Sequence, residues 1–335
     1  MNGLPTTMKA VAFTGVQQAA LVDRACDAAP LNPNELAGRT LVSLISPGTE
    51  LNFAYLGLHA TYAHMQYPVF PGYAAVLEVQ QVGSAIKDLQ PGAMVFCMGG
   101  HAAWHRTIRE QVIPVPEGLA PEAAVFARLM GVSWSTLITT TARPPDRVLV
   151  TGLGPVGNLA AQIFQTAGYR VTAVDPVEAR RALALQVGLR DVRSATPVED
   201  PALAGTIALA VECSGHEQAA LAACRVVRKR GEVALVGVPW HKRTDLPAFD
   251  LLHAVFHRYV VLRSGWEWEV PFHPRDFVVG SISANLTAAL EWLREGRVRV
   301  AGLYACRSPA ECQAAYQDLL HQRGPPAVVF DWRGV

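Results

Sequence analysis

The sequence has little charge for its length, and neither sign of charge is in excess. Of its 335 residues 17% are charged, and the formal net charge is +1. Proteins that bind nucleic acids or anionic membrane surfaces usually carry a clear basic excess, so neither partner is expected. The chain also lacks an apolar run of the roughly 18 residues that a membrane-spanning helix needs. We therefore predict a protein that acts on a small molecule, with no nucleic-acid or membrane partner.

The sequence is also poor in cysteine and in targeting signals. Residues 1–7 lack the basic, apolar and small-residue order of a signal peptide. No cysteine belongs to a C-x-x-C motif, and the wide spacing is typical of reduced thiols. These features predict a cytoplasmic protein whose free cysteines are Cys26, Cys97, Cys213, Cys224, Cys306 and Cys312.

Hydrophobic residues, by contrast, make up half of the chain, and the length is sufficient for two domains. Short strand-like segments with Gly and Pro between them, in residues 8–127, predict a β-rich, partly open barrel. Strands alternate with helices over residues 147–265, which predicts a parallel, doubly wound sheet. A final strand, helix and strand over residues 298–332 is too small to bury its own core, so we expect it to rejoin the first domain. The predicted α/β fold therefore has domains at residues 1–127, 128–282 and 283–335.

A glycine-rich turn is the strongest single motif of the sequence. An apolar strand at residues 148–150 is followed by Gly152, Gly154 and Gly157, and then by a helical pattern. This is G-x-G-x-x-G between a strand and a helix, where the glycines permit a tight turn, a close phosphate and a closely packed helix. The free N–H groups of the helix N-terminus attract the phosphates. The motif predicts a dinucleotide site that includes Gly152, Gly154, Pro155, Val156 and Gly157.

An acidic residue at the end of the next strand favours NAD as the dinucleotide. Asp175 follows Gly157 by 18 residues, close to the spacing of about 20 that is typical of a ribose ligand. Its carboxylate would accept hydrogen bonds from ribose hydroxyls and repel the 2′-phosphate of NADP. NADP remains an alternative cofactor, since Arg180 or Arg181 is able to bind that phosphate. The alternative is an ordinary glycine turn, with Asp175 as a solvated strand end.

Several further runs resemble the medium-chain dehydrogenase/reductase superfamily, and the resemblance covers nearly the whole chain. The runs are residues 71–79, 92–95, 211–215 and 231–239, besides the glycine turn. The resemblance implies a barrel-like (GroES-like) catalytic domain, an inserted Rossmann domain and a homodimer formed through sheet edges. It also implies nicotinamide contacts from Ser214, Gly215, Val236, Gly237 and Val238.

The residues that bind catalytic zinc in members of this superfamily are missing. Pro47 replaces the Cys of a C-G-T-D-like run, and Tyr73 replaces the His of a G-H-E run. No third ligand occurs in residues 127–130. Because tetrahedral zinc needs three or four Cys, His or carboxylate ligands, we predict no metal. The runs at residues 46–50 and 71–73 look most like a zinc-less branch that includes bacteriochlorophyllide-type dehydrogenases.

One alternative to the metal-free interpretation stays open. Histidines elsewhere in the first domain are able to rebuild a metal site. His101 and His105 have the spacing that places two imidazoles on one helix face. The residues of this alternative are His59, His64, His101 and His105.

Three residues are candidates for catalysis without zinc. Tyr73 is able to donate a proton to a carbonyl oxygen, since a phenol is protonated at neutral pH. Thr49 lies where the superfamily places a hydroxyl that contacts the substrate oxygen and relays protons. Glu50 is able to orient this relay. The alternatives are that Tyr73 fills space, that Thr49 is a loop hydroxyl and that Glu50 forms a buried ion pair.

The substrate pocket is predicted from aromatic residues. Tyr55 belongs to an aromatic stretch before residue 72, and Trp266 and Trp268 follow the sixth strand of the second domain. Aromatic walls suit a ring-bearing or largely apolar substrate, although a subunit interface is also rich in such residues. The sequence thus predicts a zinc-independent NAD(H)-dependent enzyme that interconverts a secondary alcohol and a ketone. The alternatives are a quinone or enoyl double-bond reductase that uses NAD(P)H, and a non-catalytic dinucleotide-binding sensor.

Overall fold

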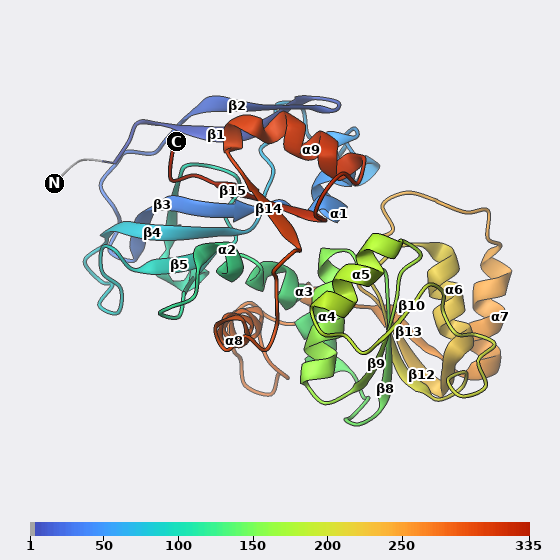
Figure 1. Ribbon diagram of the computed structural model, residues 1–335. Helices are drawn as coiled ribbons and strands as arrows, with labels where there is room; N and C mark the ends of the chain where they lie inside the picture. Colours follow the sequence, from blue (N-terminus) through green and yellow to red (C-terminus); the bar gives the residue numbers. More distant parts are fainter. Residues whose placement is uncertain (1–3) are drawn as a thin grey trace. The chain divides into compact units, whose positions relative to one another are not determined.

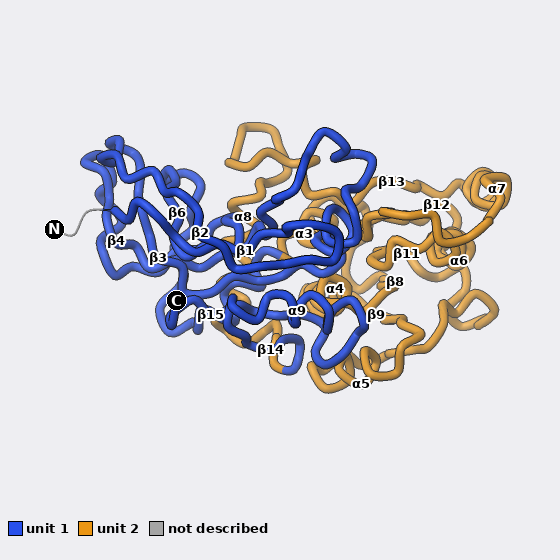
Figure 2. The backbone as a smooth tube through the Cα atoms, turned by 90° about the horizontal axis from the view of Figure 1, so that it is seen from above, with its two compact units in different colours: residues 1–128, 302–335 blue, residues 129–301 orange. Residues whose placement is uncertain are grey.

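The computed structural model describes residues 4–335, and the chain divides into two compact units (Figure 2). Unit 1 combines residues up to Arg128 with Gly302–Val335, and unit 2 is Leu129–Ala301. The predicted domain limits were 127/128 and 282/283, whereas the units divide at 128/129 and 301/302. The difference at the second limit arises because helix α8 (Ile282–Arg294) packs in unit 2, where Trp292 meets Trp134 at 4.6 Å between ring centroids. Residues 1–3 of the N-terminal segment lie outside the described residues.

Unit 1 is built on a mainly antiparallel sheet. Within the described residues the sheet has seven strands, in the order β14-β15-β3-β4-β5-β7 with β6 paired to β3, and β1 and β2 form a separate hairpin. The strands are β1 (Thr7–Gly15), β2 (Gln18–Ala25), β3 (Glu35–Leu44), β4 (Ala75–Val82), β5 (Met94–Cys97), β6 (Trp104–Ile108), β7 (Val112–Pro114), β14 (Tyr304–Arg307) and β15 (Ala327–Asp331). The helices are α1 (Pro47–Glu50), α2 (Pro121–Ala124) and α9 (Cys312–Leu320).

The C-terminal segment completes unit 1. Strand β15 pairs with β3 in antiparallel register, with Phe330 opposite Ser43. Phe330 and Trp332 lie in one buried cluster with Phe13, Tyr55 and Tyr316, the last of these from α9. The last residues therefore share a core with the first strand, which supplies the apolar surface that a lone segment of this size lacks.

Unit 2 is a doubly wound parallel sheet (Figure 1). Over residues 129–301 the strand order is β10-β9-β8-β11-β12-β13, and every neighbouring pair is parallel. The strands are β8 (Arg147–Thr151), β9 (Arg170–Val174), β10 (Asp191–Arg193), β11 (Ile207–Glu212), β12 (Val227–Leu235) and β13 (Val261–Ser264). The helices are α3 (Ala127–Thr139, which begins at the end of unit 1), α4 (Pro155–Thr166), α5 (Glu178–Gln186), α6 (Glu217–Val226), α7 (Ala248–Arg258) and α8. This order, with its reversal beside β8, is the dinucleotide-binding order, and it confirms the predicted fold class.

Both faces of this sheet are covered, which explains its continuous apolar strands. Helices α4 and α5 pack on one face in a cluster with Val148 and Val150, and α6 and α7 pack on the other with Leu149 and Val233. These four strand residues have no exposed surface. A strand buried on both sides has no polar face, so its sequence reads as an uninterrupted hydrophobic run. Within residues 4–335 no helix has both the length and the apolar character that crossing a membrane requires.

Candidate functional site

The turn after β8 has the geometry that its glycines predict. Gly152 has φ of +80°, and a Cβ there would lie 2.8 Å from the backbone N of Ser214. A Cβ on Gly157 would lie only 1.7 Å from the carbonyl oxygen of Gly152. At Gly154 a Cβ would meet no described atom within 4 Å. Two glycines therefore permit close packing of backbone, whereas the third leaves an open approach to the N-terminus of α4.

Helix α4 begins beside this open position. Gly154 is its N-cap and Pro155 its first residue, and in the described structure no side chain caps the helix. A 12-residue helix without a side-chain cap presents its first N–H groups and the positive end of its dipole to a ligand. These residues fit the pyrophosphate of a dinucleotide, with Val156 and Gly157 following in the first turn.

Asp175 is tied to the same turn. Its carboxylate accepts hydrogen bonds from the backbone N of Leu153 at 2.7 Å and of Val177 at 2.8 Å, and Nη1 of Arg180 lies 3.4 Å away. The residue is 1% exposed. Asp175 therefore fastens the glycine turn to the end of β9. Its contact with a ribose stays a prediction, as does the role of Arg180.

A buried carboxylate that was not predicted as a site residue joins the neighbouring turns. Glu212, at the end of β11, accepts from Ser214 N at 2.7 Å, from Gly215 N at 3.0 Å and from the hydroxyl of Ser214. It also accepts from Oγ1 of Thr151 at 3.3 Å. Burial raises the pKa of Glu212. The sequence signals for this residue are its place at the end of an apolar strand and within the run of residues 211–215.

The turn after β12 lies against the turn after β11. Val236 N and Gly237 N donate to the carbonyl oxygen of Glu212, at 2.8 Å and 2.7 Å. A Cβ on Gly215 would lie 2.5 Å from the carbonyl oxygen of Val238. The turns after β8, β11 and β12 thus meet at the carboxyl ends of the strands, where doubly wound sheets bind their ligands. The predicted nicotinamide contacts, Ser214, Gly215, Val236, Gly237 and Val238, all belong to these turns.

In unit 1 the structure brings Tyr73 and Thr49 together with Ser46. The hydroxyl of Tyr73 donates to Oγ of Ser46 at 2.5 Å and lies 3.3 Å from Oγ1 of Thr49. Ser46 is the N-cap of α1, and Thr49 is the third residue of that helix. Tyr73 lies in the segment that leads into β4, beside β3. We call Ser46, Thr49 and Tyr73 the hydroxyl cluster.

A cation lies beside the hydroxyl cluster. The guanidinium of Arg128 is 4.8 Å from the ring centroid of Tyr73, and Arg128 is 5% exposed. Burial raises the pKa of Tyr73, and the charge of Arg128 opposes that rise. Neither Arg128 nor Ser46 was predicted from the sequence as a site residue. Ser46 was detectable as a residue before Pro47 at a helix start, whereas no local pattern marks Arg128.

Glu50 is buried beside His101, a contact of the kind predicted as the alternative to a catalytic role. Its carboxylate lies 3.0 Å from Nε2 of His101 and accepts from the Tyr316 hydroxyl at 2.5 Å and from Ser46 N at 2.7 Å. The side chains of Glu50 and His101 have no exposed surface. The carboxylate oxygens of Glu50 are buried and bonded, and through Ser46 N the side chain anchors α1, which carries Thr49. The predicted role of Glu50 in orienting Thr49 stays a prediction.

The histidines of the alternative metal site are not gathered. His101 bonds Glu50 and Ser43, while Nε2 of His105 lies 3.1 Å from the carbonyl oxygen of Gly100. His59 accepts from Thr61 N at 3.2 Å, at the start of a short helical turn. In the described part of the chain, no group of three or more His, Cys, Asp or Glu is arranged to hold a metal ion. With Pro47 and Tyr73 at two of the ligand positions, the described residues do not fit a catalytic zinc.

The predicted substrate residues have different surroundings. Tyr55 has no exposed surface, packs on Phe13 and Tyr316 at 5.2 Å and 5.1 Å between centroids, and accepts from Gln317 at 2.8 Å. The prediction that Tyr55 lines a substrate pocket is therefore wrong, since the ring belongs to the core of unit 1. Trp266 and Trp268, in unit 2, are 64% and 50% exposed, and their contact with substrate stays a prediction.

Comparison with known sequences gives partial matches to dehydrogenases. Residues 155–267 match the family model described as zinc-binding dehydrogenase. An alcohol dehydrogenase of Geobacillus stearothermophilus is 25% identical over 306 residues, which cover 78% of this chain and 83% of that protein. A glucose 1-dehydrogenase of Methanocella arvoryzae is 30% identical over 217 residues, which cover 61% of this chain and 60% of that protein.

Comparison with solved structures shows the same fold over nearly the whole chain. Galactitol-1-phosphate dehydrogenase from Escherichia coli matches with a TM-score of 0.80 at 19% identity, covering 97% of this chain and 100% of that one. Acetophenone reductase from Geotrichum candidum, in complex with NAD, matches with a TM-score of 0.80 at 15% identity and 98% coverage of both chains. A protein of Sinorhizobium meliloti described as a zinc-binding dehydrogenase, bound to NADP, has a TM-score of 0.75 at 18% identity, with 98% and 100% coverage.

Proposed function

We propose that this chain belongs to the superfamily of medium-chain, zinc-type alcohol dehydrogenases and that it interconverts a secondary alcohol and a ketone without zinc. The observation that carries this proposal is the hydroxyl cluster beside Arg128. Tyr73 stands where a metal ligand is expected, and its hydroxyl is bonded to two further hydroxyls. The cluster is able to supply both the proton and the hydrogen bonds that a carbonyl oxygen needs as it becomes an alkoxide.

The cofactor that we propose is NAD. When bound, a nicotinamide dinucleotide supplies or accepts the hydride of the reaction. The open approach at Gly154 and the uncapped N-terminus of α4 support phosphate binding, and the carboxylate of Asp175 favours NAD over NADP. The two nucleotide-bound structures among the structural neighbours carry NAD in one case and NADP in the other, so the preference rests on Asp175.

Tyr73 is the proton donor of this proposal. Because burial raises its pKa, the phenol keeps its proton at neutral pH and donates it to the carbonyl oxygen during reduction. Ser46 and Thr49, which are bonded to the phenol, hold its position. After the phenol has given up its proton, they relay a replacement to the phenolate, each hydroxyl passing on its own proton as it takes up another from solvent. Arg128 stabilises the Tyr73 phenolate that is left after proton donation, since a cation near the ring favours negative charge there.

Substrate class, assembly and location complete the proposal. The exposed rings of Trp266 and Trp268 support a fairly apolar or cyclic substrate. Strand β13 is an edge of the parallel sheet, and its Val261 is 52% exposed, which supports a homodimer formed by edge pairing. All six cysteines lie in the described part of the chain and each is a free thiol, which supports a cytoplasmic protein.

The decisive experiment is NADH oxidation, followed at 340 nm, by EDTA-treated protein. One panel holds aromatic and cyclic ketones, and the other holds quinones and enones. Turnover of ketones after EDTA treatment is the expected result. Turnover confined to quinones or enones would assign the protein to double-bond reduction instead. Binding of NADH without turnover of either panel would favour the sensor alternative.

A further inference from the structure

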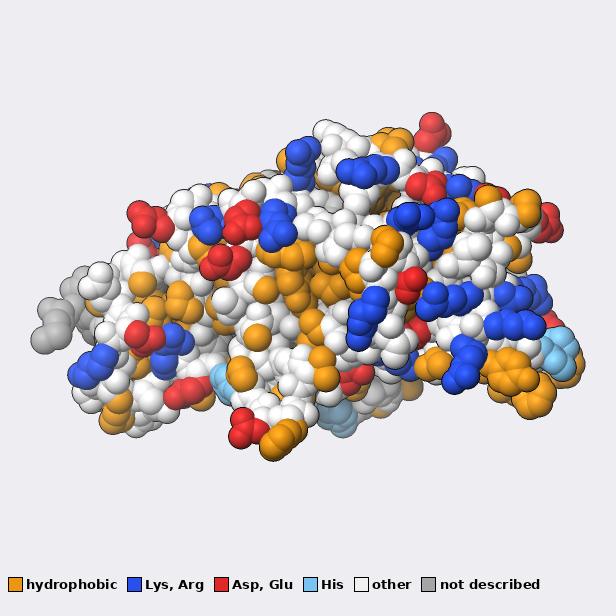
Figure 3. Space-filling model, turned by 90° about the horizontal axis from the view of Figure 1, so that it is seen from below, with side chains coloured by type: hydrophobic (Ala, Val, Ile, Leu, Met, Phe, Trp, Pro, Cys, Tyr) orange, Lys and Arg blue, Asp and Glu red, His pale blue; other side chains and the backbone are white. Residues whose placement is uncertain are grey.

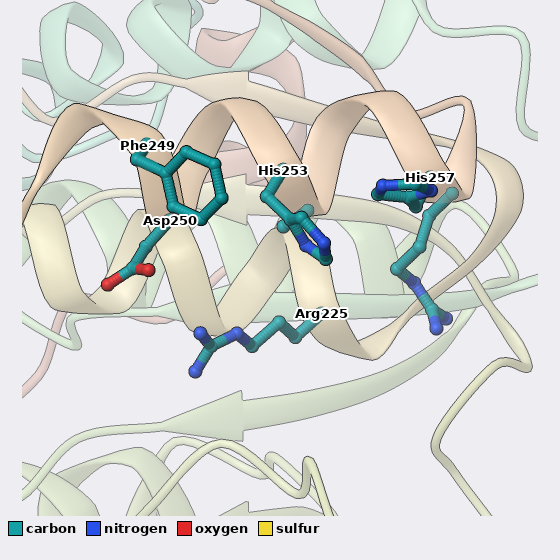
Figure 4. A pocket seen from close by; sticks show the side chains of 7 residues that line it. Arg225, Phe249, Asp250, His253 and His257 are labelled. Atoms are coloured by element: carbon teal, nitrogen blue, oxygen red, sulfur yellow. The ribbon is translucent and has the colours of Figure 1, made fainter.

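Helix α7 of unit 2 carries two histidines that the proposed reaction does not use. His253 and His257 are one helical turn apart, and both are exposed. Their ring centroids lie 4.3 Å apart with planes inclined by 50°. Figure 4 shows both imidazoles along α7 with Asp250 one turn earlier, and Arg225 of α6 on the facing wall. These residues line a surface cavity of about 340 Å³.

The separation of the two rings suits one shared metal ion. Imidazole nitrogens bind divalent transition ions at about 2.0–2.1 Å, so two nitrogens on one ion must approach within about 4 Å of each other. Side chains at positions i and i+4 of a helix lie on the same face, about 5–6 Å apart at Cβ, and are able to converge on such a point. The ring centroids of His253 and His257 are 4.3 Å apart, close enough for rotation of the side chains to bring one nitrogen of each to such a point.

Charges of both signs surround the pair, and those on α7 nearest to it favour a cation. The carboxylate of Asp250 lines the same cavity, and His257 is in the last turn of α7, where the helix dipole is negative. Arg225 opposes a cation from the facing wall. Arg258 also lines the cavity, but its Nη2 donates to the carbonyl oxygen of Val227 at 2.6 Å.

Aromatic side chains flank both imidazoles. Phe249 packs against His253 at 5.6 Å between centroids, and Phe256 packs against His257 at 5.3 Å. The two phenylalanines are themselves 69% and 76% exposed. Figure 3 shows hydrophobic and histidine side chains side by side at the end of unit 2 where α7 lies. These contacts limit the rotamers of the imidazoles, which reduces the entropy lost when an ion is bound.

We propose that His253 and His257 form a two-imidazole chelate for a divalent transition-metal ion, with water completing its coordination. Imidazole ligands select ions of the Ni²⁺, Cu²⁺ and Zn²⁺ type over Mg²⁺ or Ca²⁺, which prefer oxygen. Asp250 contributes negative charge. The site is independent of the proposed reaction, and its effect is to stabilise the last two turns of α7, which lead into edge strand β13.

The test is a calorimetric titration of tag-free, EDTA-treated and dialysed full-length protein with NiCl2. Ni²⁺ is the probe because it does not oxidise the exposed thiol of Cys306. One site per chain is expected, with a rise in the unfolding temperature on metal addition, since the ion binds the native state. H253Q and H257Q should each weaken binding by roughly 100-fold, because two linked ligands bind far more tightly than one.

Matched controls separate the chelate from a general affinity of histidine. His321 is exposed and lies outside α7, so H321Q should leave the affinity of the site unchanged. R225Q should tighten binding, and D250N should weaken it by a smaller factor than either histidine variant. The proposal is overturned if H253Q and H257Q bind Ni²⁺ with the affinity of the wild type. It is also overturned if H321Q lowers the Ni²⁺ affinity as much as H253Q and H257Q do. Circular dichroism of each variant confirms that α7 is still folded.

Discussion

The glycine turn of unit 2 and the hydroxyl cluster of unit 1 are built in opposite ways. In the turn the functional groups are backbone N–H groups. Gly152, Gly154 and Gly157 contribute by having no side chain, which leaves room for backbone and for a ligand. In the cluster the functional groups are side chains, held at 2.5 Å and 3.3 Å from the Tyr73 hydroxyl. A site made of backbone is encoded within a few consecutive residues. A site made of side chains depends on where distant segments meet.

The largest effect is expected from adding one methyl group to the turn. In G157A the new Cβ would lie 1.7 Å from the carbonyl oxygen of Gly152, so backbone has to move. We expect a loss of about 3 kcal/mol in the free energy of unfolding, since overpacking of this severity strains the turn. NADH affinity should fall by roughly 100-fold, which fluorescence titration and urea unfolding measure.

The control for this variant is G154A. Its Cβ would meet no described atom within 4 Å, and the φ of −61° suits alanine. This variant should keep the stability of the wild type and lose NADH affinity alone, because its methyl group points to the open approach. Equal stability losses in both variants would contradict the different roles of the two glycines.

The next largest effect concerns the hydroxyl cluster. Y73F removes the proposed proton donor, and general acid catalysis is worth roughly 10² to 10⁴ in rate, so kcat for ketone reduction should fall at least about 100-fold. The dissociation constant for NADH should not change. Y304F, in the same unit, is the matched control and should retain full activity. Unchanged turnover in Y73F would end the assignment of Tyr73 as donor.

The cofactor preference is tested at Asp175. D175N keeps one oxygen that can accept from Leu153 N or Val177 N, but it removes the negative charge. We expect the preference for NADH over NADPH to fall by about tenfold. The variant loses the repulsion between the carboxylate and the 2′-phosphate of NADPH, and a loss of about 1.4 kcal/mol corresponds to a factor of ten. Dissociation constants for the two dinucleotides give the ratio. A wild type that binds NADPH more tightly would show that Arg180 or Arg181 decides the preference.

A smaller effect is expected from the cation beside Tyr73. R128M removes the charge that opposes the burial effect, so the pKa of Tyr73 should rise further and the phenol should become a weaker donor. We expect kcat to fall about fivefold, with the alkaline limb of the pH–rate profile moved to higher pH, because one pKa unit corresponds to about 1.4 kcal/mol. R128K, which keeps the charge, should recover part of the activity. An unshifted alkaline limb in R128M would mean that the cation acts on structure alone.

The smallest effect is a dependence of stability on pH. Burial lowers the pKa of His105 to about 4, and the charges of His101 and Arg24 act in the same direction. The folded state therefore binds a proton less readily than the unfolded chain. This contribution is fully present above the ordinary histidine pKa of about 6.5 and is lost as the pH falls towards 4.

The measurement compares the wild type with H105Q by urea unfolding at pH 7.5 and at pH 5. Because His105 is only partly buried, we expect the wild type to lose about 1 kcal/mol more than H105Q between these pH values. Equal losses in both proteins would assign the pH dependence to other groups.

The residues predicted for catalysis show where sequence interpretation succeeds and fails. Tyr73 and Thr49 were predicted from their places in two short runs, and the structure puts their oxygens 3.3 Å apart. Tyr55 was predicted at the substrate from its aromatic surroundings, yet it lies in the core. An aromatic ring suits a core and a pocket equally well, so residue type alone does not separate the two.

The sequence alone determined the parallel sheet of unit 2 and the turn after β8. Apolar runs, turn glycines and the start of α4 are local features, since each depends on residues adjacent in the chain. Only the tertiary structure decided that Glu50 meets His101 and Tyr316, and that Arg128 lies over Tyr73. The physical reason is that a buried charged group contacts whichever distant segment folding brings beside it, and no local pattern records which segment that is.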